Sequence, residues 1–162
     1  MARKKGKKRT DKRQAKTPKR SQPKETQAQL RKVSANRLKQ ILAAHKKWLE
    51  TKGKQGKRAD LSRANLQEAN LWGTNLQKAY RYNANLQEAS LVKANLQGAD
   101  LKGAQLQGAF FYFANLQEAE LKQANLEDAE ALTQEQLNGA CGDEKTKLPF
   151  GLSIKLCPED RK

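Results

Sequence analysis

The chain has few side chains that could carry covalent or metal chemistry. Its 162 residues include one histidine, His45, and two cysteines, Cys141 and Cys157. A zinc site needs about four closely spaced ligands, and two cysteines with one distant histidine do not supply them. We therefore interpret the cysteines as reduced thiols in a reducing compartment. A disulfide between them is the alternative in an oxidising compartment.

No other pattern in the sequence is typical of an enzyme. The chain has no glycine-rich phosphate loop, no nucleophile elbow and no paired carboxylates placed for acid–base chemistry. His45 has no Asp, Cys or second His beside it, so we interpret it as a packing histidine rather than a base or a ligand. We expect no catalytic residue, no cofactor and no metal.

Positive charge is concentrated at the N-terminal end of the chain. The net charge is +16, and residues 1–58 hold 22 Lys and Arg against 3 Asp and Glu. Residues 59–162 hold 11 basic and 14 acidic residues, so this part is close to neutral. Such asymmetry indicates a tail that binds polyanions, joined to a separately folded unit.

Residues 1–25 form this basic tail, which we expect to be disordered because it has almost no apolar surface to bury. Its cations would displace counterions from the phosphates of DNA, RNA or ribosomes. The tail has no aromatic side chain to stack on bases, so the attraction carries no sequence specificity. An anionic membrane surface and a merely solubilising tail are the alternatives. The candidate polyanion-binding residues are Arg3, Lys4, Lys5, Lys7, Lys8, Arg9, Lys12, Arg13, Lys16, Lys19 and Arg20.

Residues 26–58 are predicted to hold one amphipathic helix and a linker. From Leu38 to Leu49 the apolar residues recur mostly at steps of three and four, which places them on one face of a helix. Thr26 or Ser34 is the predicted N-cap, and Gly53 the stop. The opposite face is rich in Lys and Arg. We favour a helix that covers the end of the adjoining domain, with binding to a partner or a membrane as the alternative.

Residues 59–133 repeat a pattern with a period of five. Fifteen blocks fit without a gap, and the first position is Ala in fourteen of them. The third position is Leu in twelve blocks, and the exceptions are Arg81, Phe111 and Ala131. The second position is most often Asn, as in the blocks that begin ANLQE.

A period of five fits neither a regular helix nor a regular strand. On an α-helix each Leu would lie about 140° from the last, so no apolar stripe would form. On a strand the Ala and Leu of one block share a face, but an odd period turns the next block outward. The chain must therefore turn a corner in every block and coil around an axis. Ala and Leu then fill the inside, and polar residues cover the outside.

These tandem A(D/N)LXX blocks resemble the pentapeptide-repeat family. The stretch HKKWLETKGKQGKRADLSRANL is similar to the segment that precedes the repeats in many bacterial, particularly cyanobacterial, members. LTQEQLNGACGDEKTKLP is similar to the segment that closes many such domains. The resemblance implies an all-β solenoid, a right-handed quadrilateral β-helix of just under four coils at residues 59–133. A capping α-helix would precede it, and residues 134–162 would form a C-terminal cap and tail.

The twenty residues per coil that the family implies would stack side chains twenty positions apart. Asn and Gln would then form ladders along the outside. Trp72, Val92, Tyr112 and Leu132 would form an apolar column on one face, which indicates an interaction surface. The alternative is that the helix or the C-terminal segment covers this column.

Two of the three exceptional blocks carry a large side chain in place of the Leu. Phe111 takes the place of a core Leu and is expected to point inward. Arg81 also replaces a Leu, and burying an unpaired guanidinium would be costly. Either this block bulges to bring Arg81 to solvent, or the guanidinium has a partner that the sequence does not reveal. The candidate protein interface consists of Trp72, Val92, Phe110, Tyr112, Phe113, Tyr80, Arg81 and Tyr82.

The sequence predicts a non-enzymatic interaction module. The repeats would present a rigid platform to a protein partner of unknown identity or to a second copy in a homodimer, while the tail binds nucleic acid or another polyanion. The alternatives are a purely structural protein–protein scaffold with a non-specific tail and a scaffold at a membrane surface. No secretory signal and no apolar run of about 20 residues is present, so we expect a soluble, cytoplasmic protein without a transmembrane segment.

Overall fold

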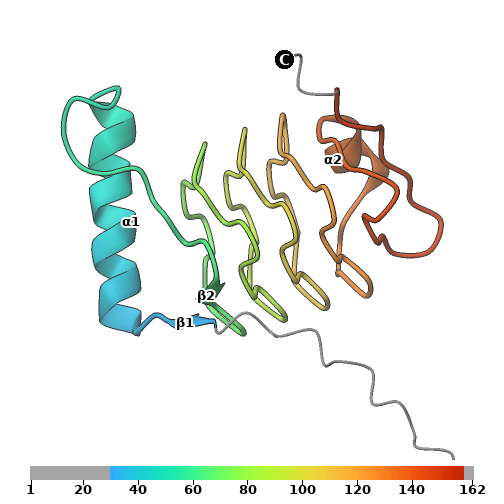
Figure 1. Ribbon diagram of the computed structural model, residues 1–162, viewed down its shortest axis with the longest axis horizontal. Helices are drawn as coiled ribbons and strands as arrows, with labels where there is room; N and C mark the ends of the chain where they lie inside the picture. The colour runs from blue at the N-terminus through green and yellow to red at the C-terminus, as the bar shows by residue number, and fades with distance from the viewer. Residues whose placement is uncertain (1–29, 159–162) are drawn as a thin grey trace, which may run out of the picture.

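The computed structural model describes residues 30–158 of the chain. Its regular elements are β1 (Arg31–Lys32), α1 (Ala35–Glu50), β2 (Ala64–Asn65) and α2 (Gln134–Asn138). Figure 1 shows α1 at one end of a stack of coils and α2 at the other end. The candidate polyanion-binding residues of the tail lie outside the described residues.

Successive coils are joined by parallel backbone bridges between residues twenty positions apart. The series runs from Asp60–Tyr80 to Phe110–Glu130 and involves all four sides of the coil. The backbone N–H of Leu66 donates to the carbonyl of Asn85 at 2.8 Å, and hydrogen bonds of this kind recur in every coil. Each side contributes a single bridge before the chain turns, so little of this ladder is long enough to count as a regular strand. The expected spacing of twenty residues is confirmed.

A tight turn closes each block from the first to the one that ends at Asp128, and the fifth residue of each has a positive φ. The last block is different, because its fifth residue, Thr133, has φ of -115° and is the N-cap of α2. In the first block Arg63 has φ of 55°, and the N–H of Ala64 donates to the carbonyl of Leu61 at 3.0 Å. Arg63 is the third of the four residues in this turn, and a positive φ at that residue is typical of a type II turn. Later corners carry glycine or polar residues, with Phe113 at 58° as the one apolar exception among the described corners. The corner expected from the odd period is therefore present in every block up to Asp128.

The interior of the coils is filled by Ala and Leu. Their side chains are buried from Ala59 to Leu126, apart from Ala69, which is partly buried. Phe111 is buried as well, as predicted for a residue in a Leu position. The amide ladders are partly formed, since Asn85 donates to Asn65 at 3.3 Å.

Helix α1 begins after Ser34, whose side chain accepts the N–H of Arg37 at 3.2 Å, and its C-cap is Thr51. Of the two predicted N-caps, Ser34 is therefore confirmed, and Thr26 lies outside the described residues. Leu38, Ile41 and Leu42 are partly buried and pack against the core of the coils. No helix within residues 30–158 is long and apolar enough to span a membrane.

Segments after the repeats continue the coil in an irregular form. In α2, Gln136 donates to the carbonyls of Phe111 and Ala114 at 2.8 and 2.9 Å, which attaches the short helix to the last coils. Cys141 then forms a bridge with Glu120.

Cys141 and Cys157 form a disulfide, with their Cα atoms 4.7 Å apart. Our interpretation of two reduced thiols was therefore wrong. The C-terminal segment returns beside the last coil, where the N–H of Cys157 donates to the carbonyl of Gly142 at 2.9 Å. This return brings together two cysteines whose sequence spacing alone does not place them.

Candidate interaction surfaces

Large apolar side chains are exposed on one side of the coil stack. Trp72, Tyr112 and Phe113 have exposed fractions of 59%, 56% and 69%. Val92 lies between Trp72 and Tyr112 in the register and is partly buried. Together with Phe110, these residues are called the aromatic surface. Neither α1 nor the described C-terminal segment covers it, because its three largest side chains remain more than half exposed.

The turn geometry explains why the aromatic surface projects outward. Trp72 and Tyr112 occupy the fourth position of their blocks, directly after a buried Leu71 or Phe111. The rings of Tyr112 and Phe113 meet edge to face, with centroids 4.4 Å apart. Lys93 lies 5.6 Å from the centroid of the Trp72 ring, so its ammonium group borders the surface. The result is an apolar patch with a cationic edge.

Tyr80 and Tyr82 are exposed, but they lie on the opposite side of the stack. Tyr82 follows Trp72 by two blocks, or ten residues. This is half of the twenty-residue period of one coil, so the two side chains point to opposite sides. The guanidinium of Arg58 lies 3.6 Å from the centroid of the Tyr80 ring and donates to its hydroxyl at 2.5 Å. Tyr80 is therefore engaged within the molecule, and our candidate interface divides into two separate surfaces.

Arg81 does not reach either surface. Its side chain is fully buried, so the block does not bulge and Arg81 is removed from the candidate interface. Its Nη2 donates to the carbonyl of Leu76 at 3.4 Å, whereas Nε and Nη1 have no hydrogen-bond partner within residues 30–158. Burial lowers the pKa of Arg81 to about 9, against a smaller opposing effect of Asp100. The regular backbone of the repeat keeps this side chain in the Leu position despite the cost.

His45 is buried where α1 meets the first coil. Its Nδ1 accepts the N–H of Ala59 at 3.1 Å. Nε2 lies near the carbonyl of Gln77 but makes no well-formed hydrogen bond. Burial lowers the pKa of His45, and the positive charges of Arg81 and Arg58 act in the same direction. This environment agrees with our interpretation of a packing histidine.

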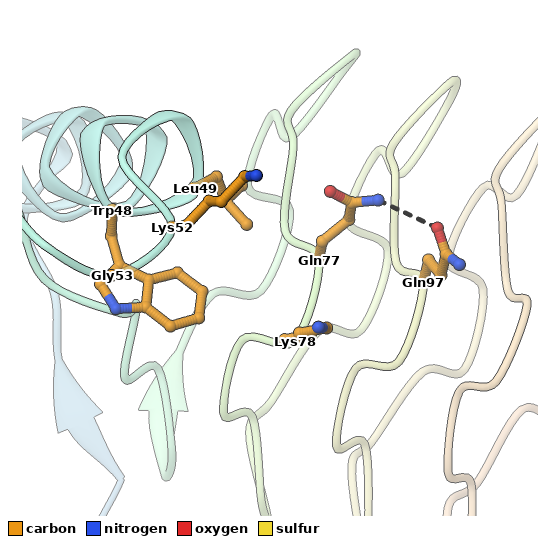
Figure 2. Close-up of a pocket in the computed structure, with 7 residues that line it drawn as sticks. All are labelled: Trp48, Leu49, Lys52, Gly53, Gln77, Lys78 and Gln97. Carbon is orange, nitrogen blue, oxygen red and sulfur yellow. Dashed lines mark hydrogen bonds between the residues drawn. The ribbon is translucent and has the colours of Figure 1, made fainter.

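A hollow of about 480 Å³ lies between the C-terminal end of α1 and one side of the coils. Figure 2 shows the indole of Trp48 on one wall and the pair Gln77–Gln97, joined by a 3.0 Å hydrogen bond, on the other. Lys52 and Lys78 add two ammonium groups to the lining. The ammonium, amide and indole groups of this lining are suited to binding. Within residues 30–158, no group of three or more His, Cys, Asp or Glu side chains is placed to hold a metal ion.

Sequence reasoning missed the cationic groups that flank α1 and the hollows that they line. Arg31, Arg37, Lys57 and Arg58 line a second hollow, at the other side of the helix. The only signal in the sequence was the basic face of the helix, which did not indicate which cations come together.

A family model described as pentapeptide repeats matches residues 57–94, 82–112 and 94–130. Among solved structures, a pentapeptide repeat protein from Nostoc PCC 7120 is 26% identical, with 78% of this chain and 97% of that chain covered and a TM-score of 0.50. A comparison with curated protein sequences finds no match.

Two further solved structures are similar over shorter parts. A pentapeptide repeat protein involved in heterocyst differentiation regulation, from the cyanobacterium Nostoc sp. strain PCC 7120, is 37% identical over 57% of this chain and 43% of that chain, with a TM-score of 0.46. A pentapeptide repeat protein from the Arabidopsis thaliana thylakoid lumen is 31% identical over 59% of this chain and 55% of that chain, with a TM-score of 0.41. The chain spans about half the length of these two proteins.

Proposed function

This chain belongs to the pentapeptide-repeat family, and from this premise we propose that it is a non-enzymatic interaction module that binds a protein through its aromatic surface. The family implies a right-handed β-helix. We propose that residues 59–133 form just under four coils of it and that α1 caps its N-terminal end. The packing of Leu38, Ile41 and Leu42 against the core supports the capping role.

The observation that carries the proposal is the exposure of Trp72, Tyr112 and Phe113 on one side of a rigid stack. Contiguous apolar side chains on a protein surface are costly to leave in water and mark interaction sites. Aromatic residues also dominate the energetics of protein interfaces. A second copy of the chain is the partner that we propose first, because the aromatic surface would then be buried against an identical one.

The polyanion-binding tail remains part of the proposal. Twelve Lys and Arg among residues 1–24 support an electrostatic attraction to nucleic acid or another polyanion. A purely structural scaffold with a non-specific tail is the second candidate. It is distinguished by reversing the charges of the tail, which would then change neither polyanion binding nor function.

The cytoplasmic location also remains a prediction. The disulfide between Cys141 and Cys157 opposes it, because disulfides persist mainly in oxidising compartments. Thiol trapping of both cysteines in fractions of the source cells tests the location. Free thiols in the cytoplasmic fraction would support the cytoplasmic location. Disulfide-bonded protein in another fraction would show that the protein is located there instead.

The aromatic surface is tested by changing Trp72 and Tyr112 together to Ser. We expect the double variant to lose self-association in sedimentation velocity and to recover less of a protein partner in affinity purification. Tyr82→Ser is the matched control, because Tyr82 is similarly large and exposed but lies on the opposite side. Unchanged oligomeric state and unchanged partner recovery in the double variant would refute the proposal.

A further inference from the structure

Four cationic side chains converge on one hollow of about 210 Å³ beside α1. Arg31, Arg37, Lys57 and Arg58 line it together with Gln40, Ile41, Ala44 and Asp60. We propose that this hollow, called the cationic pocket, binds a backbone phosphate of a nucleic acid. The inference extends the proposed polyanion binding to the folded part of the chain, and its residues are all among those that the structure describes.

The first cation is placed by the pairing of β1 with β2. Arg31 lies opposite Ala64 in a parallel register, and its N–H donates to the carbonyl of Arg63 at 2.6 Å. Its Nη2 donates to the carbonyl of Asp60 at 2.7 Å. The guanidinium is thus fixed at the edge of the first coil, where it faces the hollow.

The loop that follows α1 places two more cations, Lys57 and Arg58. The N–H of Lys57 donates to the carbonyl of Ala44 at 3.0 Å, which holds the loop against the helix. Gly56 permits this approach, because its φ is 77° and an added Cβ would lie only 2.6 Å from the backbone nitrogen of Trp48. The same loop positions Arg58, whose Nε donates to the carbonyl of Lys78.

The guanidinium groups keep donors for a ligand. Among the residues that the structure describes, Arg31 and Arg37 each make one side-chain hydrogen bond, and a guanidinium has five N–H donors. Arginine can donate two parallel hydrogen bonds to two oxygens of one phosphate. A single carbonyl or hydroxyl oxygen cannot accept such a pair. Gln40 accepts from Arg37 at 3.3 Å and so orients it along the helix.

One carboxylate, Asp60, also lines the cationic pocket. Its Oδ1 accepts the N–H of Ser62 at 3.0 Å. This hydrogen bond lowers the pKa of Asp60, and the charges of Arg31 and Lys57 contribute to the same effect. The carboxylate is therefore ionised near neutral pH, and the four cations still leave the pocket with a net positive charge.

A nucleic acid fits this site better than a membrane surface. A helix that lies in a membrane interface needs an exposed apolar face. The apolar residues Leu38, Ile41 and Leu42 of α1 are instead packed against the coils. Arg31 of the pocket begins β1, and in the sequence only six residues separate it from residues 1–24, which hold twelve Lys and Arg. A linear polyanion is the ligand that can contact both, and it binds by charge rather than by base sequence.

The test is binding of fluorescently labelled duplex DNA and duplex RNA to the full-length protein between about 50 and 200 mM salt. The pocket variant is Arg37→Gln with Lys57→Gln. The matched control is Lys145→Gln with Lys155→Gln, two exposed lysines near the C-terminal end that make the same change in net charge. We expect the pocket variant to bind about tenfold more weakly and to lose roughly 1.8 from the slope of log K against log salt, because about two phosphate contacts are lost. The control is expected to change the affinity less than about twofold. Thermal unfolding of each variant confirms that it is folded.

A third variant, with the charges of Lys4, Lys8 and Lys12 reversed, separates the pocket from the tail. If this variant loses binding while the pocket variant equals the control, the tail binds alone and the inference is wrong. If the pocket variant binds more weakly than the control variant, the inference holds, whatever the tail variant does. If the unchanged protein binds neither nucleic acid, both the inference and the proposed nucleic-acid binding are overturned. Binding to anionic phosphatidylserine vesicles without nucleic-acid binding would assign the pocket to a membrane instead.

Discussion

His45 Nδ1 accepts a 3.1 Å hydrogen bond from the N–H of Ala59, the first residue of the repeats. This bond joins α1 to the first coil at a position that is closed to solvent. The N–H of Ala59 thus depends on a neutral imidazole nitrogen. A protonated His45 would have to give up the bond, since both ring nitrogens would then be donors.

The link between α1 and the coils is therefore expected to be sensitive to acid. Burial lowers the pKa of His45 below its ordinary value of 6.5, with Arg81 and Arg58 adding to the shift. The unfolded chain then binds a proton at a higher pH than the folded chain. The free energy of unfolding should fall as the pH drops below about 6.5, by at most about 1.4 kcal/mol per pH unit.

The measurement is urea denaturation between about pH 7 and pH 5, where the ordinary histidine titrates. His45→Asn is the comparison, because its Oδ1 can accept the Ala59 N–H but does not titrate. The variant should lose less stability over this range than the unchanged protein. Parallel curves for the two proteins would show that His45 does not control the effect.

Replacing Arg81 with Met should stabilise the protein. The buried guanidinium leaves Nε and Nη1 without partners, and a Met side chain fills similar space without that cost. We expect a gain of about 1–4 kcal/mol in the free energy of unfolding. Arg63→Met removes the same charge from an exposed corner and should change stability by less than about 0.5 kcal/mol. A large loss of stability in Arg81→Met would mean that the 3.4 Å bond to the Leu76 carbonyl outweighs the desolvation.

Gly56→Ala should destabilise the protein more than Gly73→Ala. Both glycines have positive φ, at 77° and 61°, so each substitution introduces a similar backbone strain of roughly 1 kcal/mol. The added Cβ at Gly73 meets no atom within 4 Å, whereas at Gly56 it would lie 2.6 Å from the Trp48 nitrogen. Thermal unfolding of the two variants therefore isolates the contact between the loop and α1. Equal losses would indicate that the loop shifts freely.

Reduction of the Cys141–Cys157 disulfide should lower the melting temperature. The bond closes a loop with a sequence separation of 16, for which chain entropy predicts about 3 kcal/mol of stabilisation. The variant with both cysteines changed to Ser should melt at the same temperature as the reduced protein. As a control, a phosphine reductant should not change the melting temperature of this variant. A melting temperature that reductant does not change in the original protein would show that the disulfide adds no stability.

The repeat allowed the coil to be predicted in some detail. A Leu in every fifth position fits no regular helix or strand, and the corner that this requires is present in every block up to Asp128. The inward position of Phe111 followed from the same register. Arg81 was harder to place, because side-chain chemistry favours solvent while the repeat dictates the core. The regular backbone hydrogen bonds prevailed, and the guanidinium is buried.

The cationic pocket could not be predicted from sequence. Arg31 reaches it through the β1–β2 pairing, and Lys57 reaches it through the close approach of Gly56 to α1. Neither contact produces a periodic pattern. The disulfide is similar, since it depends on the return of the C-terminal segment to Gly142. The candidate site thus lies where the chain leaves the repeat, and there the repeat gives no information.

Parallel bridges between residues twenty apart also determine how such a protein can change in length. Duplication or loss of four whole blocks adds or removes one complete coil. The coils on either side of the change can still form their backbone bridges, and each of their sides keeps its direction. Gain or loss of a single block rotates the remaining sides by a quarter turn. Trp72, Val92 and Tyr112, in three successive coils of one side, would then no longer be aligned. One coil of twenty residues corresponds to sixty nucleotides of coding sequence. Insertions or deletions of this length can therefore change the length of the aromatic surface while the segments that cover the two ends of the coils stay the same.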